Sequence, residues 1–146
     1  MNRILRALTC AVVLFALGPF PAMAADATPR AAARHKVIFQ VSDNDPAKWN
    51  LALNNARNIQ QDVGSDNVDV EVVTYGPGLN MLKLESEVST RVGDALRQGV
   101  KIMACENTMA NTKVGKADML PNIGYVRAGV VELMLKQEQG WSYIRP

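Results

Sequence analysis

One cysteine stands out among the residues whose chemistry could support a function. Cys105 is followed by Glu106, Asn107 and Thr108, and the only other cysteine, Cys10, lies in an apolar N-terminal segment. A thiolate is a nucleophile, and the free amide groups at the start of a helix stabilise its negative charge. Asn107 or Thr108 can cap such a helix. The pattern therefore allows a nucleophilic thiol at Cys105, with the amides of Asn107 and Thr108 as its support.

Two features of the same segment leave the reactivity of Cys105 open. The carboxylate of Glu106 disfavours the thiolate if it lies close to the sulfur, because like charges repel. Cysteine is also commonly used as a small apolar residue beneath a helix, where the thiol packs and does not react. Both a reactive thiol and a packed thiol agree with these residues.

The remaining residues that could catalyse a reaction or hold a metal form weaker patterns. His35 is the only histidine, and it precedes the first predicted strand, so we expect no dyad with Cys105. Residue types and spacing give no tetrahedral zinc site. Met103, Met109 and Cys105 are soft donors for Cu(I), although methionine at such positions more often packs in a core. We expect no metal and no organic cofactor.

The elements that must position Cys105 alternate between strand and helix. Five short runs rich in β-favouring residues are predicted strands: residues 37–41, 68–72, 100–105, 123–126 and 141–144. Asp45 caps and Pro46 begins a helix that Gly64 ends. Helical spacing predicts two more helices, over residues 84–96 and 130–139. This alternation predicts an α/β sandwich with a mainly parallel sheet.

The first two predicted strands differ in pattern. Residues 37–41 are almost continuously apolar, which suits a strand buried on both faces. In residues 68–72, valine alternates with Asp69 and Glu71, which predicts a strand with one wet face near an edge of the sheet.

Three segments are expected at one edge of the sheet, where the strands end. Ligands of open parallel sheets bind at the carboxyl ends of the strands. The segments that follow the first three strands are residues 42–45, 75–78 and 105–108. We therefore expect Asn44, Tyr75 and Gly76 to line the same pocket as Cys105.

The first 24 residues have the pattern of a secretory signal peptide. Arg3 and Arg6 precede the apolar run 7–17, and residues 22–24 (Ala-Met-Ala) form a cleavage signal. We expect cleavage after Ala24, a periplasmic product and no remaining membrane segment. Residues 25–35 lack large apolar groups and are predicted to be a flexible linker, and residues 36–146 a single domain.

The predicted mature chain is formally neutral. Removing Arg3 and Arg6 reduces the 16 basic residues to 14, which equals the 14 acidic residues. A neutral chain lacks the basic footprint of nucleic-acid or anionic-lipid binding. It also does little to prevent self-association.

Four segments resemble the DsrE/DsrF-like family: residues 36–42 (KVIFQVS), 75–78 (YGPG), 100–109 (VKIMACENTM) and 140–146 (GWSYIRP). The similarity covers about residues 35–146 and is greatest to exported members called DsrE-family or intracellular sulfur oxidation proteins. The resemblance implies a three-layer α/β/α sandwich around a parallel five-stranded sheet, and homotrimers or homohexamers. Cys105 matches the position that carries a persulfide in sulfur-trafficking members.

Two functions follow as hypotheses. In the first, Cys105 is a sulfur carrier that takes a sulfane sulfur from a donor and gives it to the thiol of a partner. In the second, the protein is a non-catalytic oligomeric module that binds a small ligand or a thiol or redox partner, and Cys105 is packed. The accessibility and acidity of the thiol separate the two.

Overall fold

The sheet begins with strand β1 (His35–Val41), one residue before the predicted start of the domain. The computed structural model describes residues 34–146, so the predicted signal peptide and most of the predicted linker lie outside the described residues. His35 belongs to the strand and not to a linker. Arg34 pairs with Asp69 at 3.2 Å, so the chain is tied to the neighbouring strand from its first described residue.

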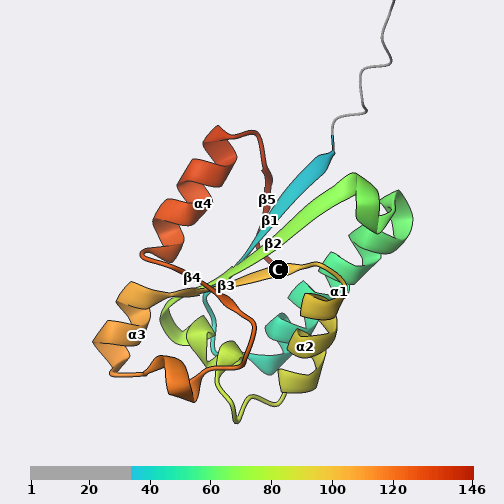
Figure 1. The fold of residues 1–146 in the computed structure, drawn as a ribbon. Coiled ribbons are helices and arrows are strands. Elements are labelled where there is room, and N and C mark those ends of the chain that lie inside the picture. The colour runs from blue at the N-terminus through green and yellow to red at the C-terminus, as the bar shows by residue number, and fades with distance from the viewer. Residues whose placement is uncertain (1–33) are drawn as a thin grey trace, which may run out of the picture. The chain divides into compact units, whose positions relative to one another are not determined.

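Four further strands complete the sheet: β2 (Val68–Thr74), β3 (Lys101–Cys105), β4 (Gly124–Val126) and β5 (Ser142–Ile144). Their order is β4-β3-β2-β1-β5, and each neighbouring pair is parallel (Figure 1). The α-helices are α1 (Pro46–Val63), α2 (Ser89–Arg97), α3 (Glu106–Thr112) and α4 (Gly129–Glu138). The 3-10 helices are η1 (Ser65–Asn67), η2 (Gly76–Leu82) and η3 (Lys116–Asp118).

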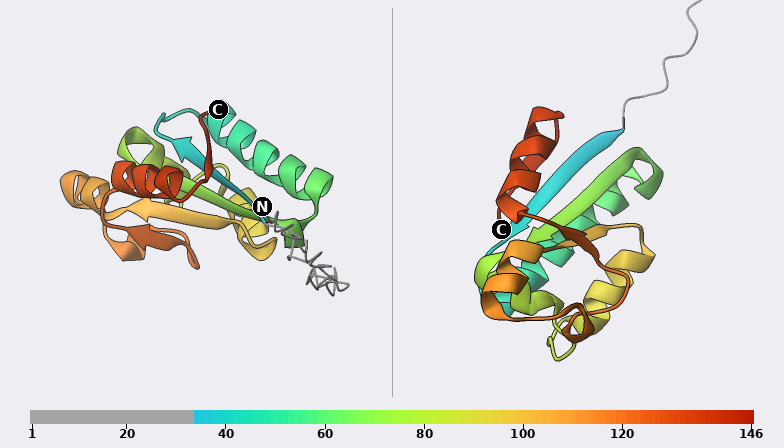
Figure 2. Two further views of the ribbon diagram at one scale, coloured as in Figure 1. Left: turned by 90° about the horizontal axis from the view of Figure 1, so that it is seen from above. Right: turned by 60° about the vertical axis from the view of Figure 1, so that its left-hand side comes forward.

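The helices form two layers around the sheet, so the predicted three-layer α/β/α architecture is confirmed (Figure 2). Alternate side chains of each strand point to opposite faces. The face under α1 and α2 holds the larger apolar cluster, which includes Phe39, Val72 and Ile102. The face under α4 holds a smaller one, whose buried members are Ile38, Val73, Leu133 and Trp141. None of the helices in residues 34–146 is long and apolar enough to cross a membrane.

Helix α1 forms where local signals agree. The side chain of Asp45 accepts a hydrogen bond from the amide of Ala47 at 2.9 Å, and Pro46 occupies the first helical position. The helix ends at Gly64, whose φ of 87° is costly for a residue with a side chain. Its start and end are those that the sequence predicts.

The predicted place of the second strand was wrong. β2 is the central strand of the sheet, and Glu71 is 1% exposed. Its carboxylate does not face water because Lys136 of α4 lies over it, with Nζ 2.8 Å from Oε2. The alternation of valine with acidic residues therefore marks a buried ion pair and not a wet face.

The helix predicted over residues 84–96 begins later, at Ser89. Residues 82–84 pair instead with residues 118–120: the amide of Leu84 donates to Asp118 O at 3.0 Å and that of Leu120 donates to Leu82 O at 2.8 Å. These hydrogen bonds hold the segment extended, and Leu84 is 54% exposed. The apolar residues that precede it, in η2, enter the core instead.

Candidate functional site

The three loops expected at one edge of the sheet are joined by hydrogen bonds. The amide of Gly78, after β2, donates to the carbonyl oxygen of Ser42, after β1, at 3.1 Å. The amide of Gly76 donates to the hydroxyl of Thr108, after β3, at 2.9 Å. The loops after β1, β2 and β3 therefore form one continuous surface at the carboxyl ends of the strands.

Cys105 lies between the starts of two helices. It is the last residue of β3 and the N-cap of α3, which begins at Glu106, so the prediction that Asn107 or Thr108 caps this helix was wrong. The amide of Gly129, the first residue of α4, donates to the sulfur at 3.3 Å. The positive ends of two helix dipoles therefore meet at one sulfur atom.

Hydrogen bonds to the sulfur of Cys105 favour its thiolate. Burial raises the pKa of the thiol, because a charge is poorly solvated there. The hydroxyl of Thr108 and the amides of Gly129, Thr108 and Asn107 lower the pKa by more, so it lies below the ordinary value of a cysteine. Within residues 34–146, the protonated thiol donates only to the carbonyl oxygen of Arg127, at a long 3.9 Å. These surroundings suit the nucleophilic form of cysteine.

The two residues that follow Cys105 turn away from the sulfur. The carboxylate of Glu106 pairs with the ammonium group of Lys116, with Oε1 and Nζ 3.1 Å apart, which compensates its charge. Asn107 is exposed, and its amide donates to the carbonyl oxygen of Arg127 at 3.0 Å. Its effect on the thiol therefore comes from an amide that is already hydrogen-bonded elsewhere.

Tyr75 packs against Gly129, the residue whose amide donates to Cys105, whereas Asn44 is not connected to the cysteine. A Cβ atom at Gly129 would lie 3.1 Å from Cβ and Cδ1 of Tyr75, so the tyrosine touches the residue that donates to Cys105. Burial raises the pKa of Tyr75. Asn44 is exposed and accepts a hydrogen bond from Asn80 at 3.1 Å. Within residues 34–146, no hydrogen bond joins Asn44 to Cys105.

Residues 35–146 match the DsrE/DsrF-like family. The chain belongs to the DsrE/DsrF-like family. The match begins at the first residue of β1 and runs to the C-terminus, so it includes every element of the sheet and the segment around Cys105.

Solved structures agree with this family membership. The chain is 35% identical to the protein of unknown function MTH1491 from Methanobacterium thermoautotrophicum, with a TM-score of 0.73, covering 77% of this chain and 99% of that one. The protein of unknown function BT1422 from Bacteroides thetaiotaomicron is 16% identical, with a TM-score of 0.58, covering 76% of this chain and 94% of that one. The ychN protein from E. coli is 12% identical, with a TM-score of 0.63, covering 77% of this chain and 99% of that one. These two similarities concern the fold alone. The search of curated proteins gave no match.

The soft donors considered for Cu(I) do not converge in this DsrE-family fold. Met109 packs in the cluster under α1 and α2, whereas Met103 packs against the cluster under α4. The two methionines therefore lie on opposite faces of the sheet. Residues 34–146 also contain no group of three or more histidine, cysteine, aspartate or glutamate side chains that could hold a metal ion.

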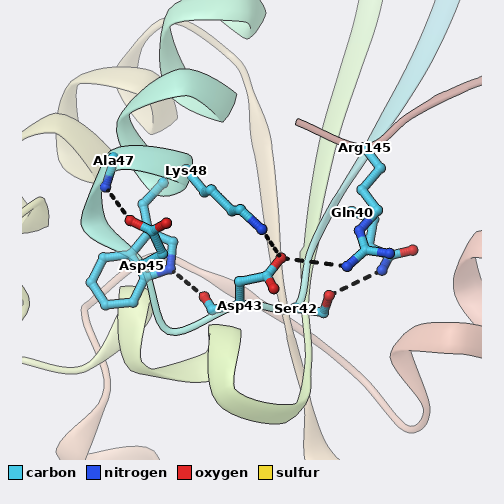
Figure 3. A network of polar contacts seen from close by, with 8 residues as sticks. Gln40, Ser42, Asp43, Asp45, Ala47, Lys48 and Arg145 are labelled. Carbon is cyan, nitrogen blue, oxygen red and sulfur yellow. Dashed lines mark hydrogen bonds and ion pairs between the residues drawn. The ribbon is translucent and has the colours of Figure 1, made fainter.

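The loop after β1 is held by ion pairs of its own (Figure 3). The carboxylate of Asp43 lies 3.2 Å from the ammonium group of Lys48 and 3.5 Å from the guanidinium group of Arg145. The hydrogen bond from Lys48 lowers the pKa of Asp43. Gln40 donates to the hydroxyl of Ser42 at 3.1 Å. The C-terminal residues are thereby tied to the same edge of the sheet.

Sequence reasoning missed Gly129, the most direct amide donor to the sulfur. Its signal was the glycine at the start of the apolar run 130–135. A Cβ atom at position 129 would lie 3.1 Å from Tyr75 and from Cγ1 of Val73, so glycine lets α4 approach the sheet closely. The close packing of α4 brings the amide of Gly129 to the sulfur of Cys105, which lies 24 residues earlier in the chain. Only the folded structure reveals this contact.

We expect Thr108→Val to raise the pKa of Cys105, because valine keeps the shape of threonine but lacks the hydroxyl that favours the thiolate. A hydrogen bond to a charged group contributes about 1.5–3 kcal/mol, so alkylation at a fixed pH below the pKa should slow by roughly tenfold. Iodoacetamide alkylation rates measured against pH test this. Thr112→Val is the matched control, since that hydroxyl donates to a carbonyl oxygen of the same helix. Equal pKa values in the two variants would contradict the prediction.

Proposed function

We propose that this protein is a sulfur carrier that holds sulfur as a persulfide on Cys105. The observation that carries the proposal is the sulfur atom of Cys105 at the starts of α3 and α4, 3.3 Å from the amide nitrogen of Gly129. Family membership supports it, because Cys105 matches the position to which the resemblance assigns the carried sulfur.

The transfer needs only exchange between thiolates and sulfane sulfur. The Cys105 thiolate attacks the terminal sulfur of a donor persulfide, R–S–SH, and the S–S bond of the donor breaks. R–S⁻ leaves with the electron pair, and Cys105 becomes Cys–S–SH. A thiolate of the acceptor then attacks the terminal sulfur, and Cys105 leaves as the thiolate. No net oxidation occurs, and the chemistry requires no metal or organic cofactor.

The amides around Cys105 act on both steps. They stabilise the thiolate that attacks in the first step and leaves in the second, and a thiol of lower pKa is the better leaving group. The test is to load the mature protein with a small persulfide, remove the excess donor and treat the protein with cyanide, which releases sulfane sulfur as thiocyanate. We expect about one thiocyanate per chain. No release from protein that remains folded would refute the proposal.

One observation favours the second candidate function, a binding module with a packed cysteine. Cys105 is 4% exposed, so a donor reaches the sulfur only through the surrounding loops. A hollow of about 360 Å³ between η2 and α3 is lined by Thr108, whose hydroxyl lowers the pKa of Cys105. Cys105 itself does not line this hollow, so the carrier function requires the loops around Thr108 to open a path from the hollow to the sulfur. If donors cannot reach the sulfur of Cys105, the protein is the non-catalytic binding module, and the hollow is its binding site.

We further propose that the protein works as a homotrimer or homohexamer that associates through α4. Four large apolar side chains of this helix are 41–62% exposed: Val130, Val131, Met134 and Leu135. They form two adjacent pairs at i, i+4 spacing, and with Tyr143, which is 40% exposed, we call them the α4 apolar patch. A patch of this kind on a soluble chain marks an interaction surface.

We expect Val130→Glu combined with Met134→Glu to dissociate the oligomer, because two buried carboxylates in a subunit contact cost several kcal/mol. Light scattering at micromolar concentration measures the mass. Leu84→Glu is the matched control: Leu84 is 54% exposed but lies outside the α4 apolar patch, so this variant should assemble like the wild type. A monomeric wild-type protein would refute both the oligomer and its surface.

We propose that the protein acts in the periplasm after cleavage of its leader. The support is the leader pattern of residues 1–24, which lie outside the described part of the structure. N-terminal sequencing of the protein recovered from the cell envelope should read Ala25-Asp26-Ala27. A periplasmic product that still begins at Met1 would contradict the prediction.

A further inference from the structure

A buried charge lies under α4 and has no part in the sulfur chemistry. Glu71 of the central strand is 1% exposed, and its Oε2 lies 2.8 Å from Nζ of Lys136. Glu132, one turn earlier in α4, lies 3.4 Å from the same ammonium group. Lys136 also lies over the ring of Trp141, with Nζ 4.4 Å from its centroid. One lysine thus connects the helix, the central strand and the start of β5.

Lys136 is the cation that holds Glu71. In the neighbouring strands, Ile38 of β1 and Lys101 of β3 stand beside Glu71 in register. Lys101 is exposed, and among residues 34–146 Glu71 forms an ion pair with Lys136 only. The second carboxylate oxygen of Glu71, Oε1, is buried without a hydrogen-bond partner.

The buried ion pair between Glu71 and Lys136 is weak evidence for stability. Burial raises the pKa of Glu71, and the attraction of Lys136 does not offset this cost. Burial also lowers the pKa of Lys136, but Glu71 and Glu132 raise it by more, so the lysine stays charged. Buried ion pairs are often neutral or unfavourable compared with well-packed apolar residues, and their best-attested use is to select one packing arrangement over others.

Helix α4 could pack on the sheet in more than one orientation, so an interaction that selects one of them is useful. Its buried residues are Gly129 and Leu133, whereas the four exposed members of the α4 apolar patch on the same helix offer alternative faces. Apolar burial alone therefore does not determine which side of α4 meets the sheet. Gly129 lies at one end of the helix, and Lys136 lies seven residues later, about 10 Å along its axis. The contact between Lys136 and Glu71 holds the far end of α4 on the central strand and so restrains the rotation of the helix about its axis.

We infer that Glu71 and Lys136 are positioning residues for Cys105, because their ion pair fixes α4 on the sheet so that the amide of Gly129 reaches the sulfur. The biological role of this positioning rests on the proposed function, because Cys105 is the thiol that would carry sulfur. Its test is the acidity of that thiol, which can be measured whether or not sulfur is carried.

The test replaces both charges with apolar residues, Glu71→Leu with Lys136→Met. This double variant should unfold at a denaturant concentration equal to or above that of the wild type. The alkylation rate of Cys105 at a fixed pH below its pKa should nevertheless fall by roughly tenfold, because the Gly129 amide no longer faces the sulfur. The two replacements remove equal and opposite charges, so a change in net charge does not explain the effect.

The control removes an ion pair elsewhere. Asp94→Leu with Arg97→Met eliminates the pair on α2, on the opposite face of the sheet, and should leave the alkylation rate of Cys105 unchanged. A wild-type alkylation rate in the Glu71 and Lys136 double variant would overturn the inference and make the pair purely structural.

Two single variants keep the test valid if the double variant does not fold. Lys136→Arg keeps a cation beside Glu71 and should retain the wild-type alkylation rate, whereas Lys136→Gln should lower it. Equal rates in these two variants would overturn the inference. A lowered rate in Lys136→Gln, together with a wild-type protein that never gains sulfur, would support the positioning role and refute the sulfur carrier.

Discussion

Replacing Cys105 with serine is expected to abolish sulfur loading and transfer completely. Cys10 lies in the predicted leader, so the chain expected after cleavage has no second thiol that can take over. A serine hydroxyl is too weak a nucleophile at neutral pH, without an adjacent base, to accept sulfane sulfur. Thiocyanate released by cyanide from the loaded protein should fall from about one per chain to the background value.

The same variant should keep its fold and its assembly. Serine is close to cysteine in size, and its oxygen can accept the hydrogen bond from the amide of Gly129. Thermal unfolding and light scattering should therefore match the wild type. Sulfur loading that persists in Cys105→Ser would show that the sulfur is held elsewhere, and the proposed function would fail.

Gly78→Ala is expected to cause the largest loss of stability among the glycine-to-alanine replacements in residues 34–146. A Cβ atom at position 78 would lie 2.3 Å from the carbonyl oxygen of Val41 and 2.9 Å from Cα of Ser42. Both are backbone atoms at the end of β1, so neither can move aside as a side chain would. We expect a decrease of more than about 3 kcal/mol in the free energy of unfolding, measured by chemical denaturation.

Gly93→Ala provides the matched control for Gly78→Ala. Gly93 lies inside α2, and the nearest atom to an added Cβ is Nη1 of the flexible Arg97 side chain, at 3.5 Å. Alanine is the better helix former, so this variant should gain about 0.5–1 kcal/mol. Two variants that lose equal stability would contradict the account of how β1 and η2 pack.

The parts of the fold that follow local rules could be predicted from the sequence. Helix α1 begins after Asp45 and ends before Gly64, and both signals lie within a few residues of the boundaries that they set. The five predicted strands lie close to those in the structure, because short β-favouring runs between glycines and polar turns are recognisable without knowledge of their partners. The order of the strands was not predicted, because it depends on which distant segments pair.

The features that depend on distant partners could not be predicted in this way. Glu71 suggested a wet face because its partner, Lys136, lies 65 residues further along the chain. Leu84 continued a helical pattern, but hydrogen bonds with residues 118–120 hold its segment extended. The close approach of Gly78 to Val41 also joins two segments far apart in the sequence, so no local pattern predicts it.

The candidate site also combines features that local sequence predicts with features that depend on distant contacts. The position of Cys105 at the end of a strand followed from local pattern, and so did its place near the start of a helix. The second helix at the sulfur, α4, comes from the segment between β4 and β5, whose connection returns across the whole sheet. Its contribution to the acidity of the thiol therefore depends on topology.

The most direct test of the central claim is the intact mass of the native mature protein after exposure to a persulfide donor. We expect the gain of one sulfur atom, ~32 Da, which a thiol reductant removes and which prior alkylation of Cys105 prevents. An unchanged mass, in a protein whose Cys105 resists alkylation until it is unfolded, would contradict the account. Cys105 would then be a packed core residue, and the binding module would be the remaining function.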